Sequence, residues 1–484
     1  MKSIKRNFIY NILLNVSSVI FPLITAPYVS RVLEPDGVGL FNFSFTYAGY
    51  FALVAKLGIP TYGAREVSKL RNDSQKLSCL ISELLSISAY VSLIVSFVYL
   101  ASVALIGQLS SNYIIFLVAG FAVYLSPFQI NWYFQGIEEF GYITFRNLTV
   151  RILGILCLFL FVRDKDDLLI YVVINVLSGI VADIWNFLML KSHGINIGIV
   201  CKGLLPHVKP LLILFASTLA ISIYTVLDTL MLGFMCNYSE VGYYNNAIHI
   251  TKTILAVITS LSIVALPRVA YYKKENDFVK IKAIVNKSIS FVSLMAFPIV
   301  SALICISSIF VPLFLGDKFE GAVVPLMILS LLVIFIGLSN IFGMQVLIGL
   351  GYDSCFLRSM VSGAILNFLL NYLLIPSYGS IGASVSSVVA EFVVMIMTLF
   401  YMKNRTDIQI SCWQDILKSL LGSLLLFPLM FVIKSYFGGW LLLAVFAILA
   451  SIIYLCFESI VRNSSITLFK STIRQFFVNH TSQL

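Results

Sequence analysis

The sequence predicts an all-α integral membrane protein, and three observations lead to this fold class. Hydrophobic residues form 60% of the 484-residue chain and charged residues only 11%, with a mean hydropathy of +0.98. Soluble domains use only about 45–50% apolar residues. Apolar runs of about 20 residues, long enough to cross a bilayer as a helix, recur along the whole chain. Basic residues gather on alternate connectors between these runs, as in proteins that cross the membrane repeatedly.

The apolar runs predict about 14 transmembrane helices. No connector is long enough to hold a soluble domain, so the functional groups must lie within the membrane. The eight cysteines occur singly, without a CxxC pair, and predict neither a disulfide framework nor a metal site. The expected spans lie near residues 8–30, 38–58, 80–107, 113–135, 147–162, 168–190, 211–233, 241–266, 289–315, 322–349, 359–375, 380–402, 419–436 and 440–458.

The net charge of +10 is explained by topology rather than by nucleic-acid binding, because the basic residues alternate from side to side. Since lysine and arginine accumulate on cytoplasmic connectors, both termini are expected in the cytoplasm. The basic side comprises the N-terminus, Arg65 to Lys76, Arg146, Lys191 to Lys209, Arg268 to Lys287, Arg358, Lys403 to Lys418 and the C-terminal tail. The opposite side holds Arg31, Arg163, Lys165, Lys318 and Lys434.

An internal repeat divides the chain into halves. Val38-Gly39-Leu40-Phe41-Asn42 opens the second span, and Val241-Gly242-Tyr243-Tyr244-Asn245 opens the eighth, at an offset of 203 residues. Two six-span halves in the same order have the same orientation, which predicts a parallel repeat about an axis along the membrane normal. We therefore expect a six-helix lobe over residues 1–200, a second over 201–403, and two additional helices with a cytoplasmic tail over 404–484.

The two repeated helices carry polar residues on corresponding faces. Asn42 and Lys56 share one face of the second span at helical spacing, and the repeat offset leads to Asn245, His249 and Lys252 in the eighth. A charge deep in a bilayer normally faces a protein interior or a wet cavity. Lys56 lies near a span end and could instead snorkel to the headgroups. Lys252 is too deep for that and either faces the cavity or pairs with a carboxylate, while His249 is either a cavity group or a packing residue.

Three acidic residues also fall within predicted spans: Asp183, Asp228 and Glu391. Because a carboxylate in a span needs a partner or a function, each is a candidate for ion coupling. Glu391 shares a stripe with small residues that are typical of close helix packing. It is therefore either an ion-coupling group or the partner of a buried base.

The chain resembles the polysaccharide-repeat-unit (Wzx-type) flippases of the multidrug/oligosaccharidyl-lipid/polysaccharide exporter superfamily. The resemblance runs the whole length. It rests most specifically on the segment from Pro27 to Gly39, on Gly58 with Tyr62 to Glu66, and on Trp132 to Gly136 with the later Arg146. It implies two six-helix lobes forming a V and cation-coupled alternating access.

The resemblance also implies a substrate, undecaprenyl-pyrophosphate carrying a short oligosaccharide, moved from the inner to the outer leaflet of the bacterial cytoplasmic membrane for O-antigen or capsule synthesis. Lysine and arginine suit a pyrophosphate, and Lys252, Lys56 and Arg31 are available for it. Amides suit sugars, and Asn42 and Asn245 are available with His249 nearby. Further amides are offered by Asn131, Gln135, Asn367 and Asn371.

Energy and partners follow from what the sequence lacks. There is no GxxxxGK[ST] phosphate loop, so we expect no cofactor and a proton or sodium gradient as the driving force. We expect no enzymatic activity, since no large external loop could carry catalytic groups. Membrane lipids and the polysaccharide polymerase machinery are the expected partners. The alternatives are a multidrug exporter of the same superfamily, which should favour cavity acids, and a peptidoglycan-precursor flippase, which usually has arginines in its first two spans.

Overall fold

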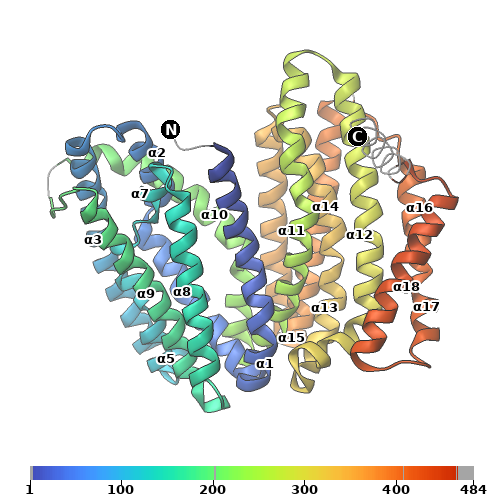
Figure 1. The fold of residues 1–484 in the computed structure, drawn as a ribbon, viewed down its shortest axis with the longest axis horizontal. Helices are drawn as coiled ribbons and strands as arrows, with labels where there is room; N and C mark the ends of the chain where they lie inside the picture. Colours follow the sequence, from blue (N-terminus) through green and yellow to red (C-terminus); the bar gives the residue numbers. More distant parts are fainter. Residues whose placement is uncertain (1–3, 201–202, 407, 465, 467–484) are drawn as a thin grey trace, which may run out of the picture. The chain divides into compact units, whose positions relative to one another are not determined.

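The computed structural model describes residues 4–200, 203–406, 408–464 and 466, and within these ranges it contains helices and no strand (Figure 1). The chain forms two compact units, unit 1 over Met1–Gly242 and unit 2 over Tyr243–Leu484. The prediction of an all-α membrane fold is confirmed. The tail beyond residue 466, which the sequence predicts to be cytoplasmic, lies outside the described residues.

Unit 1 contains ten helices and two short 3₁₀ turns among its described residues. A paired helical hairpin, α8 and α9, packs beside α1, and α2 packs against the short α7. The elements are α1 (Ile4–Lys56), α2 (Ile59–Leu70), α3 (Ser74–Leu105), α4 (Gly107–Ser110), α5 (Tyr113–Ala119), α6 (Phe121–Tyr124), η1 (Ser126–Phe128), α7 (Asn131–Gly136), α8 (Phe140–Phe161), η2 (Lys165–Asp167), α9 (Leu168–Ser192) and α10 (Leu205–Met235).

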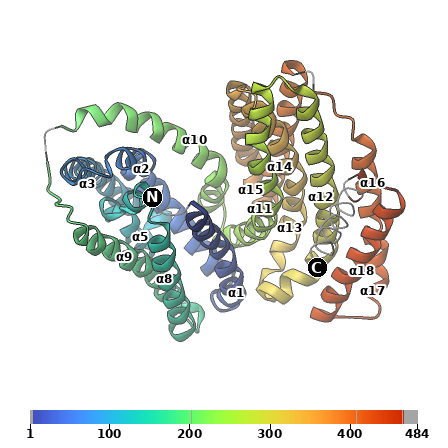
Figure 2. The same ribbon diagram turned by 45° about the horizontal axis from the view of Figure 1, so that its top comes forward.

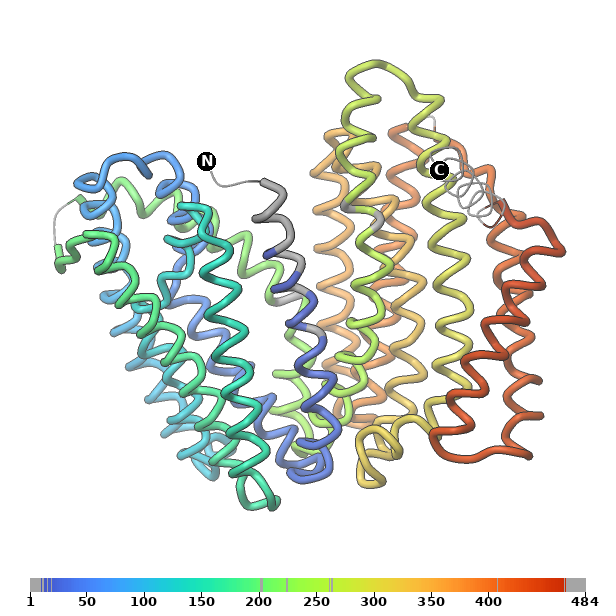
Figure 3. The backbone as a smooth tube through the Cα atoms, in the orientation of Figure 1, coloured from blue at the N-terminus to red at the C-terminus, as the bar shows by residue number. Residues whose placement is uncertain are grey.

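Helix α1 joins the first two predicted spans across a kink. Its 53 residues would measure roughly 80 Å if straight, far more than the ~30 Å hydrocarbon core. Glu34 has a φ of 59° and a ψ of 174°, so it leaves the helical conformation, and Pro35 follows without an N–H for the helical ladder. The tube bends sharply there (Figure 3). The two halves of α1 can thus act as separate crossings.

Helix α10 belongs to unit 1 by its packing. It contacts α1 and α2, and Figure 2 shows its curved course. Gly58 caps α2 with a φ of +75°. It lies close to α10, because a Cβ added at Gly58 would lie 2.8 Å from the carbonyl oxygen of Leu211. The lobe boundary predicted at residue 200 was drawn from the repeat and stays a prediction.

The connector between α9 and α10 contains an extended segment, residues 195–200, that we call the strap. Every second backbone N–H of the strap donates to the hydroxyl of a serine on α3, and those serines are spaced by one helical turn. The bonds run from Asn196 to Ser78 at 3.3 Å, from Gly198 to Ser82 at 3.1 Å and from Val200 to Ser86 at 2.9 Å.

Two histidines hold the connector at its ends, and both make the same pair of side-chain contacts. Each meets a tyrosine hydroxyl through Nδ1 and a glutamate through Nε2. His193 meets Tyr133 at 3.1 Å and Glu139 at 3.9 Å, and His207 meets Tyr62 at 2.8 Å and Glu83 at 2.9 Å.

Unit 2 is organised around α12. Its buried side chains, such as Ile289 and Val292, form a core with those of α14, η4 and α15, and α16, α17 and α18 pack on the same helix. The elements are α11 (Tyr238–Lys274), α12 (Phe278–Leu315), η3 (Asp317–Ala322), α13 (Val323–Ser330), α14 (Leu332–Asn340), the π-helical η4 (Ile341–Ile348), α15 (Asp353–Arg405), α16 (Trp413–Leu424), α17 (Leu426–Ile433) and α18 (Gly439–Ile460).

The described residues contain 11 helices that are long and apolar enough to cross a membrane, or 12 if the pair of segments bent by 42° over residues 113–136 is one span. Two of the 11, α1 and α15, each carry two of the predicted spans, joined at the kinks at Glu34 and Gly379. The predicted total of 14 stays a prediction.

Candidate functional site

A buried arginine lies inside unit 1. The side chain of Arg146 on α8 is only 1% exposed, and its guanidinium stacks on the ring of Tyr142 with 5.8 Å between Cζ and the ring centroid. One terminal nitrogen donates to Oδ1 of Asn186, and the other donates to Oδ1 of Asn147 at 2.6 Å. A buried guanidinium requires such acceptors, because desolvating a charge without them is costly.

Asn186 on α9 connects this arginine to two further elements. It is fully buried, its Oδ1 also accepts from the Tyr142 hydroxyl at 3.2 Å, and its Nδ2 donates to Oδ1 of Asn131 on α7 at 3.1 Å. One amide therefore satisfies polar groups of α7 and α8 at the same time. This network fixes the mutual position of α7, α8 and α9 within unit 1.

The charged partner of Arg146 is Asp183. This carboxylate lies one turn before Asn186 on α9 and interacts electrostatically with both Arg146 and Lys56. Lys56, the last residue of α1, is half-buried and lines a small pocket with Ser88 and Gln129. The structure thus brings two of the predicted site residues, Lys56 and Asp183, into one cluster of two cations and one carboxylate.

Arg146 itself was placed wrongly by the sequence, which assigned it to a basic connector before a span beginning near residue 147. Helix α8 begins at Phe140, and Arg146 is therefore a buried helical residue. A single hydrophobicity profile cannot tell a loop arginine from a buried one. The signal that could have found it is the helical spacing of Tyr142 and Arg146, four residues apart on one face.

The other candidates of unit 1 lie apart from one another along α1 and α10. Arg31 is exposed and precedes the kink at Glu34, while Asn42 is half-buried on the second half of α1. Asp228 on α10 is 8% exposed and interacts electrostatically with Tyr50 of α1. Asp228 thus belongs to the contact between α1 and α10.

The candidates of unit 2 lie mainly on α11. Asn245 is buried, whereas His249 and Lys252 are exposed and interact electrostatically with each other. The face on which the sequence placed all three is therefore only partly accessible. Glu391 is half-buried on α15, and on the same helix the buried Asn371 donates to Asn367 at 3.1 Å. Over the described parts of the chain, no group of three or more His, Cys, Asp or Glu side chains could hold a metal ion.

Comparison with known proteins identifies the family. The family described as polysaccharide biosynthesis protein matches residues 4–273, more than half of the chain. The chain belongs to this family. A putative O-antigen transporter of Escherichia coli K12 is 27% identical over 413 residues, covering 83% of this chain and 97% of the relative. A probable low-salt glycan biosynthesis flippase of Haloferax volcanii is 23% identical over 220 residues, 44% of this chain and 45% of that relative.

Solved structures show that the fold is shared more widely than the sequence. The lipid II flippase MurJ, in an inward closed conformation, aligns with 94% of this chain and 98% of its own at a TM-score of 0.73 and 17% identity. An inward-facing MATE multidrug resistance transporter of the MOP superfamily aligns with 80% of this chain and 94% of its own at 0.61 and 14% identity. The resemblance to Wzx-type members of that superfamily, inferred from the sequence, is confirmed.

Proposed function

We propose that this protein is a flippase that moves undecaprenyl-pyrophosphate-linked oligosaccharide repeat units across the bacterial cytoplasmic membrane for O-antigen or capsule synthesis. The observation that carries the proposal is the match to a putative O-antigen transporter over almost the full length of that relative, within a family described as polysaccharide biosynthesis proteins. We also propose that both termini are cytoplasmic and that the protein has no enzymatic activity. The polysaccharide polymerase machinery is proposed to receive the transported product.

The charges within the spans support a substrate with an anionic head. Lys252 is exposed on α11, and Lys56 of unit 1 is half-buried and lines a small pocket. Cations placed in a membrane are costly unless they serve an anion or a pathway, and a pyrophosphate offers several acceptor oxygens to lysine and arginine. A multidrug exporter of cations would gain nothing from these basic residues.

Transport is proposed to use a proton or sodium gradient. Asp183 interacts electrostatically with two cations, so neutralising it changes the charge balance around both of them. Binding of a cation at Asp183 would leave Lys56 and Arg146 without their shared anion and favour a different arrangement of the cluster. Asp228 and Glu391 remain the alternatives, and replacing each acid by its amide shows which one carries the coupling.

The test measures export of the lipid-linked oligosaccharide per folded molecule for variants of Lys252. If Lys252 engages the pyrophosphate, Lys252→Ala and Lys252→Gln lose export while Lys252→Arg retains much of it, because the charge is what matters. Lys434→Gln, which removes another exposed lysine, serves as the matched control and keeps normal export. Near-normal export by folded Lys252→Gln would rule out the pyrophosphate role. Export that continues after both ion gradients are collapsed would rule out ion coupling.

A further inference from the structure

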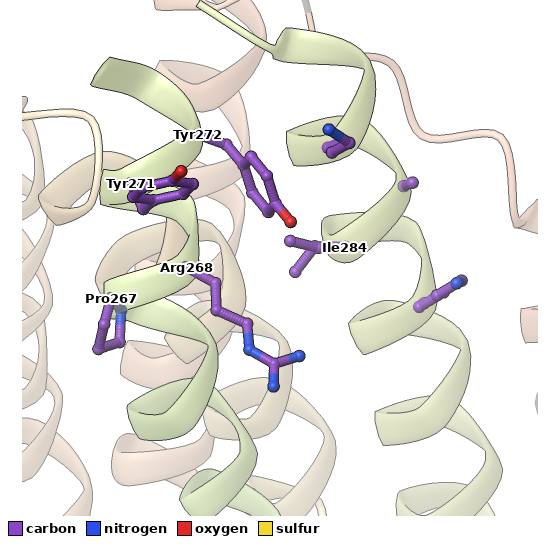
Figure 4. A pocket seen from close by; sticks show the side chains of 8 residues that line it. Pro267, Arg268, Tyr271, Tyr272 and Ile284 are labelled. Atoms are coloured by element: carbon purple, nitrogen blue, oxygen red, sulfur yellow. The ribbon is translucent and has the colours of Figure 1, made fainter. Parts of the chain in front are cut away.

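A basic pocket in unit 2 lies between the ends of α11 and α12, outside every site considered so far. It encloses about 410 Å³. Arg268, Lys280 and Lys287 line it together with Tyr271 and Tyr272. Figure 4 shows the Arg268 guanidinium extending from α11 into the space toward α12.

The pocket carries an excess of positive charge. Lys280 lies 2.7 Å from Asp277 and stacks on Tyr272, so its charge is partly compensated. Within the described ranges, neither Arg268 nor Lys287 forms an ion pair. Residues 267–288 contain six lysines and arginines against two acids, and a basic cluster of this size directly beside a transmembrane helix is typical of binding to anionic lipid headgroups.

The pocket is continuous with an apolar stripe along α11. Val257, Val264 and Tyr271 are 76%, 64% and 58% exposed, and because they are spaced by seven residues they lie on one face of the helix. The stripe therefore ends at the pocket. Pro267 and Ile284 add apolar side chains to the lining of the pocket. This combination suits an amphipathic ligand with an anionic head and a hydrocarbon chain.

We propose that this pocket binds the phosphate group of a membrane lipid. Arg268 suits a phosphate through two parallel hydrogen bonds, Lys287 adds a second charge, and the tyrosine hydroxyls can donate to the remaining oxygens. The ligand is either an anionic phospholipid of the surrounding leaflet or the pyrophosphate of the lipid-linked substrate. The second source rests on the proposed function, whereas the first does not.

The experiment measures lipid binding to the full-length protein by native mass spectrometry. The protein is titrated in phosphatidylcholine alone, with phosphatidylglycerol, and with undecaprenyl pyrophosphate. The pocket variant is Arg268→Gln with Lys287→Gln. Its matched control, Lys274→Gln with Lys282→Gln, removes the same charge from the same helical hairpin at positions that do not line the pocket. All four side chains are at least partly exposed, so both variants are expected to fold, and their elution on size exclusion verifies this.

A basic residue near an anionic lipid surface is worth about 1 kcal/mol, or about fivefold in affinity. If Arg268 and Lys287 contact the phosphate directly, losing both should weaken binding by at least about 30-fold, whereas the control pair acts only through a field screened by salt and should weaken binding less. If the pocket variant loses affinity selectively for phosphatidylglycerol, the ligand is a phospholipid of the bilayer. If it loses affinity selectively for undecaprenyl pyrophosphate, the ligand is the lipid-linked substrate. Equal losses for the pocket and control pairs, with either lipid, would overturn the proposal.

Discussion

Replacing Asn186 by leucine should strongly destabilise unit 1, because one buried amide satisfies three polar groups. The substitution removes the acceptor of Arg146, the acceptor of the Tyr142 hydroxyl and the donor to Asn131. Leucine has nearly the same volume, so the change acts on hydrogen bonding rather than on packing.

The magnitude follows from the type of each bond. A hydrogen bond to a charged group is worth about 1.5–3 kcal/mol and a neutral one about 0.5–1.5 kcal/mol, so the three bonds together contribute about 2.5–6 kcal/mol. The apolar surface of leucine returns about 1 kcal/mol, which leaves a loss of roughly 1.5–5 kcal/mol. For a unit of 242 residues, this lowers the midpoint of thermal unfolding by roughly 3–20 °C.

The assay is the loss of the monodisperse peak in fluorescence-detected size exclusion after heating in detergent. Asn175→Leu is the matched control, since Asn175 lies on the same helix and donates to the carbonyl of Tyr171 one turn back, at 2.8 Å. This variant loses a single neutral hydrogen bond, so its free energy of unfolding should fall by no more than about 0.5–1.5 kcal/mol. Asn186→Asp keeps an acceptor for Arg146 and should therefore lose less thermal stability than Asn186→Leu. Equal midpoints for Asn186→Leu and Asn175→Leu would refute the argument.

Three further predictions concern packing, pH and topology. Gly136→Ala should cost about 1–3 kcal/mol in thermal stability, because the added Cβ would lie 2.7 Å from Val67. Gly179→Ala, where nothing lies within 4 Å, should instead stabilise, and the opposite order would contradict the packing. The side chain and backbone of Lys280 hold the pKa of Asp277 below its usual range. The contribution of Asp277 to the free energy of unfolding is therefore complete above about pH 4 and is lost as the pH falls through the lowered pKa. Asp277→Asn should make stability depend less on pH in the acid range. An unchanged pH dependence would count against this. Reporter fusions should place both termini in the cytoplasm, and an external signal from either would overturn the topology.

The fold was largely predictable because the bilayer imposes a length on every span. The predicted span at residues 80–107 corresponds to α3, and the one at 289–315 corresponds to the apolar part of α12. Helix α12 starts 11 residues earlier, at Phe278. Its first turns carry Lys280, Lys282 and Lys287, so a hydrophobicity criterion stops before the helix does.

The candidate site was less predictable because its contacts join distant parts of the chain. The helical phase placed Lys56 on a polar face, and the acid Asp183 was found by its position in a span. That the two interact could not be inferred from one sequence, since 127 residues separate them and either could have met another partner. The buried network of Arg146 was missed for a related reason: its main acceptor, Asn186, is a neutral residue on the next helix.

The strap is an extended chain and α3 is a helix, and the repeat lengths of the two almost coincide along their contact. Four residues of helix advance about 6.0 Å and two residues of extended chain advance about 6.6 Å, so the two repeats stay nearly in step over the three bonds. A displacement of the strap by two residues would again place N–H groups opposite the serines and keep its side chains on the same faces. A displacement by one would bring the N–H groups of Ile195, Ile197 and Ile199 to the serines and turn every side chain of the strap to the opposite face. The register of the strap is therefore expected to change by two residues at a time, which corresponds to one turn of α3. A two-residue insertion before Asn196 should be tolerated where a one-residue insertion is not, and equal stability of the two insertion variants would show that the strap has no such stepwise register.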